Sequence, residues 1–333
     1  MGSFLRYCFI AITAAFVLAS AVFVRSLAAP ARENKAQIFT VLPGEGLRDL
    51  SDRLETEGFI RSAGSFRFYA VLVGSAHALK PGTYEVTSSE SVPDIVERFA
   101  EGPQDITVTI QEGGTLKDVD RILGDRGILT EGAIVQLSVA EFRDRYPFLK
   151  NVKSLEGFLF PDTYKFAPGS LARVVTEKML DVFAVKAYPE LAASGNDWYK
   201  HLIIASLVEK EVPDVAEDRA IVSGIIARRL NIGMGLQIDA TIAYAKCGGA
   251  LLTCGDIRLV RDDYAIASPY NTYAHAGLPP TPIANPGVNA IRAAINPKKT
   301  DYLFYLSDPK TKRTIFSKDF EEHNEQRAKY LGL

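Results

Sequence analysis

A helix-forming stretch that ends in two carboxylates carries the residues best suited to chemistry. Residues 198–212 are WYKHLIIASLVEKEV, and Pro213 follows directly, where proline cannot continue a helix. Apolar side chains surround nearly the whole helix axis, which is typical of a buried helix. Carboxylates are seldom buried unless they are paired or have a task. The stretch therefore predicts a buried helix whose last turns present Glu209 and Glu211 to the protein interior.

These two glutamates cannot enter the same cleft. Two residues turn a helix by roughly 200°, so Glu209 and Glu211 lie on different faces. Glu211 lies in the last turn, where the helix dipole disfavours its negative charge, and apolar neighbours raise the carboxyl pKa further. A carboxyl group that keeps its proton near neutral pH suits a general acid. The alternative is an internal salt bridge from Glu211 to Arg219 or Arg228 on the next helix.

Four separated segments place polar residues among aromatics and prolines. They are residues 155–164, the helix end at 209–211, residues 236–241 and residues 269–283. Each segment has a structural explanation on its own: Asp239, for example, can cap a helix, and the proline run can stiffen a loop. The candidates for substrate binding in these segments are Glu156, Glu209, Gln237, Asp239, Asn271 and Tyr273.

The bulk composition limits the classes of protein to consider. The chain has 333 residues, 47% of them hydrophobic and 23% charged, with a net charge of −2. This is a globular composition of a length that suits two domains, and it offers no basic surface for nucleic acid. The four histidines are scattered and no metal-binding spacing occurs, so we expect no metal site.

The N-terminus carries an apolar run of 18 residues, Tyr7 to Val24, between Arg6 and Arg25. As a helix it would span roughly 27 Å, close to the hydrocarbon thickness of a bilayer. A cleaved signal peptide is the alternative, since Ser26–Ala28 offers small residues. The length of the run favours an uncleaved anchor, with residues 1–35 forming anchor and linker. One basic residue precedes the run and several follow it, so charge does not settle its orientation.

Two of the three cysteines, Cys247 and Cys254, flank a short loop that contains two glycines. This arrangement suits a local disulfide, which would indicate an oxidising compartment. Two free buried thiols are the alternative.

Residues 36–130 contain an internal repeat with an offset of 69 residues. Each copy, beginning at residues 38 and 106, reads as a short strand, a glycine turn and an amphipathic helix. Residues 39–47 (FTVLPGEGL) resemble the opening of a LysM-type module, which implies glycan binding by residues 36–150. A plain packing domain is the alternative.

Residues 151–333 read as a second domain. Long helices are separated by loops rich in proline, glycine and asparagine, and two short strands near residues 302–306 and 314–316 precede a C-terminal helix. Helices and strands segregate rather than alternate, which predicts an α+β fold.

Together and in this order, the four polar segments resemble the YceG-like family of endolytic murein transglycosylases. The resemblance implies an enzyme held in the inner (plasma) membrane by one N-terminal helix, with an extracytoplasmic catalytic domain that cuts nascent peptidoglycan strands internally. It gives Glu211 the role of the family's essential glutamate, leaves Glu209 as a neighbour without an assigned role, and makes cell-wall elongation proteins possible partners.

The resemblance also implies a chemistry that differs from hydrolysis. A single glutamate would protonate the glycosidic oxygen between N-acetylmuramic acid and N-acetylglucosamine, and would then take the proton of the muramoyl C6 hydroxyl as that oxygen closes on C1. The product would be a 1,6-anhydro end, so the resemblance implies a lyase that needs neither a metal nor an organic cofactor. We expect Gln237, Asp239, Asn271 and Tyr273 to line the cleft.

Two other functions compete with this one. A non-catalytic, membrane-anchored scaffold that binds peptidoglycan fits the LysM-like repeat but not a buried Glu211. A membrane-anchored serine peptidase is poorly supported, because the Ser-x-x-Lys sequence at Ser307–Lys310 contains Pro309 and cannot form the helical turn that this motif needs.

Overall fold

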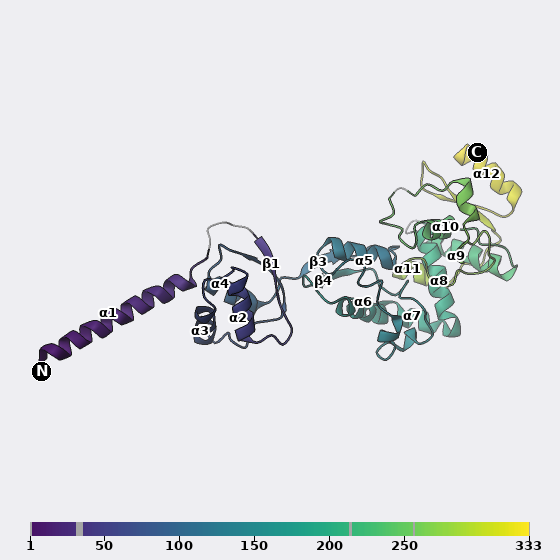
Figure 1. Ribbon diagram of the computed structural model, residues 1–333. Coiled ribbons are helices and arrows are strands. Elements are labelled where there is room, and N and C mark those ends of the chain that lie inside the picture. Colours follow the sequence, from purple (N-terminus) through teal and green to yellow (C-terminus); the bar gives the residue numbers. More distant parts are fainter. Residues whose placement is uncertain (1, 31–35, 213–214, 256, 333) are drawn as a thin grey trace. The chain divides into compact units, whose positions relative to one another are not determined.

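The computed structural model describes residues 2–30, 36–212, 215–255 and 257–332, and its chain divides into two compact units (Figure 1). The first unit comprises Met1–Ile106 and Lys165–Ser170, and the second comprises Thr107–Tyr164 and Leu171–Leu333. Both helices and short antiparallel strands are present, so the expected α+β class is confirmed.

The first unit begins with helix α1 (Gly2–Leu27), which is apolar enough to cross a membrane. Its segment Phe9–Leu27 has a mean hydropathy of 2.1 over an 18-residue window, and none of that window is buried. A membrane anchor and a signal sequence share this property.

The rest of the first unit is a small strand–helix–helix–strand fold followed by a third helix. Its strands β1 and β2 pair in antiparallel register, with Phe39 opposite Tyr84. Phe39, Phe66 and Phe99 are among the side chains that fill its core. The interpretation of this unit as a LysM-like, glycan-binding module stays a prediction. Its elements are β1 (Ala36–Val41), α2 (Leu47–Thr56), α3 (Ala63–Leu72), β2 (Gly82–Thr87) and α4 (Val92–Glu101).

The repeat seen in the sequence recurs in the backbone. Helix α5 (Leu116–Asp125) begins and ends 69 residues after α2. The glycine turn before each helix adopts a positive φ, +79° at Gly44 and +76° at Gly113, a conformation that glycine reaches without steric cost. The strand of the second copy is β3 (Ile106–Thr109), which pairs with β4 (Thr163–Phe166).

The compact units divide at residue 106 rather than near the expected boundary at 150. The reason is packing: Phe142, Phe148 and Leu149 are buried in the same cluster as Phe158 and Phe183 of the C-terminal region. The division into a glycan-binding and a catalytic domain stays a prediction.

The second unit is built around helix α8 (Trp198–Glu211). Its other helices and strands include α6 (Ala172–Lys186), α7 (Tyr188–Ala193), α9 (Ala216–Asn231), α10 (Asp239–Lys246), α11 (Val288–Ile295), β5 (Phe304–Ser307), β6 (Thr314–Ser317) and α12 (Phe320–Leu331). Short 3₁₀ helices lie at Val139–Phe142, Pro147–Leu149, Gly195–Asp197 and Arg261–Ala265.

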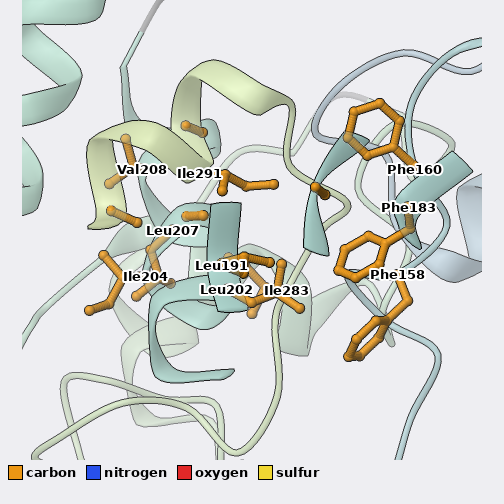
Figure 2. Close-up of a cluster of buried hydrophobic side chains, with 14 of the residues drawn as sticks. Phe158, Phe160, Phe183, Leu191, Leu202, Ile204, Leu207, Val208, Ile283 and Ile291 are labelled. Carbon is orange, nitrogen blue, oxygen red and sulfur yellow. The ribbon is translucent and has the colours of Figure 1, made fainter. Parts of the chain in front are cut away.

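The sequence prediction of a buried helix is confirmed in α8. Every residue from Leu202 to Val208 is buried, and Figure 2 shows Leu207 and Val208 of α8 close to Ile291 of α11. Each such side chain contributes roughly 1.5–3 kcal/mol through burial. Val212, which follows the helix, has an extended backbone (φ −128°), so α8 ends at Glu211 and its position is fixed by the core.

A disulfide joins Cys247 and Cys254 after α10. Asp118 holds the same loop, because its carboxylate accepts hydrogen bonds from the backbone N–H groups of Leu251, Leu252 and Thr253.

Candidate active site

Glu211 lies in a pocket of about 550 Å³ in the second unit. The pocket combines carboxylate, cationic and aromatic side chains from α8, α9, the start of α10, β5 and α12. The residues that line it are Glu211, Arg229, Gln237, Asp239, Tyr264, Tyr273, Phe304, Tyr305, Leu306, Phe320, His323, Arg327 and Leu331.

The carboxyl group of Glu211 is held by a hydrogen bond from a tyrosine. The Tyr305 hydroxyl donates a hydrogen bond of 2.8 Å to Glu211 Oε2. Burial raises the pKa of Glu211; the Tyr305 hydrogen bond opposes this rise, and the nearby charge of Asp239 adds to it. The net direction is upwards, which favours the protonated carboxyl that a general acid needs.

Glu209 points elsewhere, as the helix period predicts. Its Oε1 accepts a hydrogen bond of 2.7 Å from Arg219 Nη2, and its Oε2 accepts one of 3.0 Å from the Gly287 backbone N–H. The two charged side chains are only 3% and 5% exposed. The salt bridge considered for Glu211 is thus made by Glu209, while Arg228 pairs with Asp301.

Asp239 and two tyrosines form one wall of the pocket. The Tyr273 hydroxyl donates a hydrogen bond of 2.6 Å to Asp239 Oδ1, and Tyr264 is also hydrogen bonded to Asp239. The two rings meet edge to face, with centroids 4.8 Å apart. Burial, and then the hydrogen bond to Asp239, raise the pKa of Tyr273, so this hydroxyl stays protonated and donates.

Gln237 also lines the pocket and is exposed. Its backbone adopts a positive φ of +50°, which is uncommon for a residue other than glycine. Its N–H donates to the Thr272 carbonyl, and the Ile238 N–H donates to Thr272 Oγ1. Thr272 thereby fixes the loop that carries both Gln237 and the start of α10.

Asn271 is fully buried and is absent from the pocket lining. Its side-chain N–H groups donate to the carbonyls of Tyr264 and Ile266, and its Oδ1 accepts from the N–H of Tyr273. The structure therefore places Asn271 behind the two tyrosines, where it shapes their loop.

Glu156 is also separate from the pocket. It is 2% exposed, and its carboxylate accepts hydrogen bonds from the Leu116 N–H and the Tyr244 hydroxyl. Burial raises its pKa to about 8. The structure thus brings Glu211, Gln237, Asp239 and Tyr273 together and leaves Glu209, Asn271 and Glu156 outside.

Comparison with known proteins follows this geometry. The sequence model of the YceG-like family matches residues 39–329. The chain belongs to the YceG-like family. The family resemblance of the four polar segments is therefore confirmed.

Three members of the family illustrate its range. The endolytic murein transglycosylase of Bacillus subtilis (strain 168) is 28% identical over 332 residues, which cover 93% of this chain and 90% of that protein. The protein of the same name from Streptococcus pneumoniae (strain D39) is 29% identical, and the match covers 96% of this chain but 65% of that protein. The crystal structure of a YceG-like protein from Listeria monocytogenes matches with a TM-score of 0.59 at 30% identity, covering 88% of this chain and all of that one.

Several pocket residues of this YceG-like chain were not singled out in its sequence, Tyr305 and Arg229 among them. Tyr305 lies in an apolar strand, and its hydroxyl group was the one feature of that strand that could have indicated a hydrogen bond to the site. Arg229 is 7% exposed; it donates hydrogen bonds to the carbonyls of Leu236 and Leu303 and lies 5.2 Å from the Phe304 ring centroid. Its N–H groups thus connect the loop before α10 to the start of β5.

Helix α12 closes one side of the pocket with residues three to four positions apart. His323 stacks on Phe304 with ring centroids 5.1 Å apart, and Arg327 lies one turn further along. Within the described part of the chain, no group of three His, Cys, Asp or Glu side chains has the arrangement of a metal site.

Proposed function

We propose that this chain is an endolytic murein transglycosylase that cleaves the β-1,4 bond between N-acetylmuramic acid and N-acetylglucosamine inside nascent peptidoglycan strands. The family membership and the names of the relatives from Bacillus and Streptococcus support the substrate and the reaction class. The observation that carries the proposal is the position of Glu211: a carboxyl group of raised pKa, hydrogen bonded to a tyrosine, in a polar pocket.

In the first step, Glu211 acts as the acid. Its carboxyl proton passes to the glycosidic oxygen, the bond from C1 of the muramoyl residue to that oxygen breaks, and N-acetylglucosamine leaves with a free hydroxyl. Positive charge develops at C1. A carboxyl group with a raised pKa retains the required proton before the reaction and still transfers it to an oxygen whose basicity rises as the bond breaks.

In the second step, the same group acts as the base. The Glu211 carboxylate takes the proton of the muramoyl C6 hydroxyl while O6 forms a bond to C1, which closes the 1,6-anhydro ring. Glu211 regains its proton and no water is consumed. Because the nucleophile belongs to the substrate, proximity replaces the second carboxylate that ordinary glycosidases use.

The other pocket residues have supporting roles in this scheme. Tyr305 orients the Glu211 carboxyl group. Asp239, oriented by Tyr273, offers negative charge near the developing positive charge at C1, and Gln237 offers an amide for the sugar's polar groups. Asn271 acts indirectly, by shaping the loop of Tyr273.

We further propose that α1 is an uncleaved anchor in the plasma membrane and that both compact units are extracytoplasmic. A polymeric wall substrate outside the membrane motivates this orientation. The strand–helix units of residues 36–130 support glycan binding, and cell-wall elongation proteins remain possible partners.

The test compares the full chain in detergent with E211Q and with E217Q, an exposed glutamate whose ion pair to Lys298 lies on the surface. Each protein is incubated with purified peptidoglycan, and soluble fragments are analysed by mass. We expect wild type and E217Q to release anhydro-ended fragments, lighter by one water than hydrolysis products, and E211Q to be slower on the order of 10²–10⁴-fold. If wild type releases none but sediments with peptidoglycan, the scaffold function replaces this proposal.

A further inference from the structure

Helix α3 carries an apolar face that its own unit leaves uncovered. Phe68, Val71 and Leu72, spaced as i, i+3 and i+4, are 59%, 63% and 66% exposed, whereas Phe66 and Ala70 on the opposite side are fully buried. Single exposed apolar side chains are ordinary. Three large ones on the outer face of one helix form a patch of the kind that marks an interaction surface.

Helix α3 lies beside the end of the apolar helix α1 (Figure 1). Ser26 Oγ donates a hydrogen bond of 2.6 Å to Ser65 Oγ, and the rings of Phe23 and Phe68 meet edge to face with centroids 5.2 Å apart. A step of three residues forward along α3 thus matches a step of three residues back along α1. The chain directions of α1 and α3 are therefore opposed at this contact.

A guanidinium group fastens the start of α3 to the end of α1. Arg61 Nη2 donates a hydrogen bond of 2.7 Å to the Ala29 carbonyl, and Arg61 Nε donates to the carbonyls of Ala28 and Ala29 at 3.2 and 3.0 Å. Both carbonyls directly follow Leu27, the last residue of α1. The contact holds α3 close to the point where α1 ends.

The candidate span of α1 sets the depth of α3. The span runs from Phe9 to Leu27, and Phe23 lies four residues before its end, about 6 Å along the helix. A ring in contact with Phe23 therefore lies at the same depth. If α1 crosses a bilayer, Phe68 cannot remain in water, because its neighbour on α1 lies below the surface of the hydrocarbon.

We propose that α3 is an interfacial helix that inserts Phe68, Val71 and Leu72 into the outer part of the lipid bilayer in which α1 is anchored. The partner is a lipid surface, and Arg61 at the start of α3 suits the level of the lipid headgroups. The first unit is then held against the membrane by two helices. This inference rests on the proposed anchoring of α1, and it is independent of the chemistry at Glu211.

Tryptophan quenching by brominated phospholipids tests the insertion on the full chain in proteoliposomes. Trp198 is the single tryptophan of the sequence, so the parent chain supplies the background emission. The variants F68W and L72W add a reporter to the α3 face. F16W adds one to the middle of α1, and L42W adds one to the turn after β1, where the native leucine is similarly exposed at 52%.

We expect the added emission of F68W and L72W to be lost with bromine placed near the headgroup end of the acyl chains. We expect F16W to lose more with bromine near the bilayer midplane, because Phe16 is about 16 Å from Leu27 along the helix. L42W should keep its emission with both lipids. The use of two reporters on α3 guards against a local effect of either substitution.

The controls separate the two proposals. If F16W is quenched while F68W and L72W match L42W, the interfacial role of α3 is wrong and the anchoring of α1 stands. If F16W is not quenched either, both are wrong. Neither result bears on the transglycosylase reaction, which the E211Q comparison tests.

Discussion

Replacing Glu209 with glutamine should destabilise the second unit while leaving Glu211, the proposed acid, in place. Arg219 and Glu209 are 3% and 5% exposed, and their Nη2 and Oε1 atoms are 2.7 Å apart. In E209Q the buried guanidinium group loses the counter-charge of Glu209. Removal of one partner from a buried ion pair costs about 3–5 kcal/mol, and one kcal/mol lowers the melting temperature by roughly 2–4 °C for a unit of this size.

The expected loss of folding free energy arises from the ion pair with Arg219 and from the hydrogen bond that Gly287 donates to Glu209. Glu209 Oε2 also accepts the Gly287 N–H, so both carboxylate oxygens face donors. A glutamine offers one acceptor and turns an NH₂ group towards the other donor, which leaves one buried donor without its bond. The double variant E209L/R219M removes both charges and should recover most of the loss, because replacing a whole buried pair is often neutral.

The chain provides its own probe for this measurement. Trp198 begins α8 and packs edge to face against Tyr188, with ring centroids 5.6 Å apart, so its fluorescence reports on the unit that contains Glu209. In urea titrations, wild type should have the highest midpoint, E209L/R219M a slightly lower one, and E209Q the lowest. A midpoint for E209Q equal to that of wild type would refute the assignment of Glu209 to structure. So would a stable E209Q with the activity loss of E211Q.

Three further predictions concern Tyr305, Glu156 and the disulfide. Removing the Tyr305 hydroxyl (Y305F) takes away a bond that stabilises the Glu211 carboxylate, so the pKa of Glu211 should rise further; the alkaline fall of kcat/KM, measured against pH, should move to higher pH. Burial raises the folded-state pKa of Glu156 to about 8. As pH rises, Glu156 therefore loses its proton in the unfolded state before it does so in the folded state. The free energy of unfolding should fall between about pH 4.5 and pH 8, by about 1.4 kcal/mol per pH unit. E156Q should flatten this fall in urea titrations and match wild type near pH 5, whereas parallel slopes would contradict the assignment. Reduction of the Cys247–Cys254 disulfide, with a sequence separation of 7, should cost at most roughly 2–3 kcal/mol by loop entropy and leave peptidoglycan cleavage intact, because neither cysteine lines the pocket.

Local sequence was sufficient to predict α8 and the different orientations of its two glutamates. The apolar pattern, the following proline and the helix period are properties of one continuous stretch. The same locality explains the agreement of α2 and α5 at an offset of 69 residues. The boundary near residue 150 failed to match the compact units because loop composition changes there, while the packing of Phe142 and Phe148 depends on partners distant in sequence.

The remaining parts of the pocket depend on contacts between distant segments. Tyr305 is 94 residues from Glu211, and nothing within β5 distinguishes a tyrosine that orients an acid from one that only packs. Asn271 illustrates the opposite difficulty. A polar residue among aromatics can line a cleft, or it can fix the shape of a buried loop. Only the hydrogen bonds to the carbonyls of Tyr264 and Ile266 show that Asn271 does the latter.

The pairing of charges helps to explain why the pKa of Glu211 is raised, as its proposed role as an acid requires. The buried charge of Arg229 lowers the pKa of Glu211, while the N–H groups of Arg229 donate to the carbonyls of Leu236 and Leu303. Arg219 is likewise engaged by Glu209. Burial, together with the nearby charge of Asp239, outweighs the interactions that lower the pKa of Glu211, so the net shift favours the protonated carboxyl group.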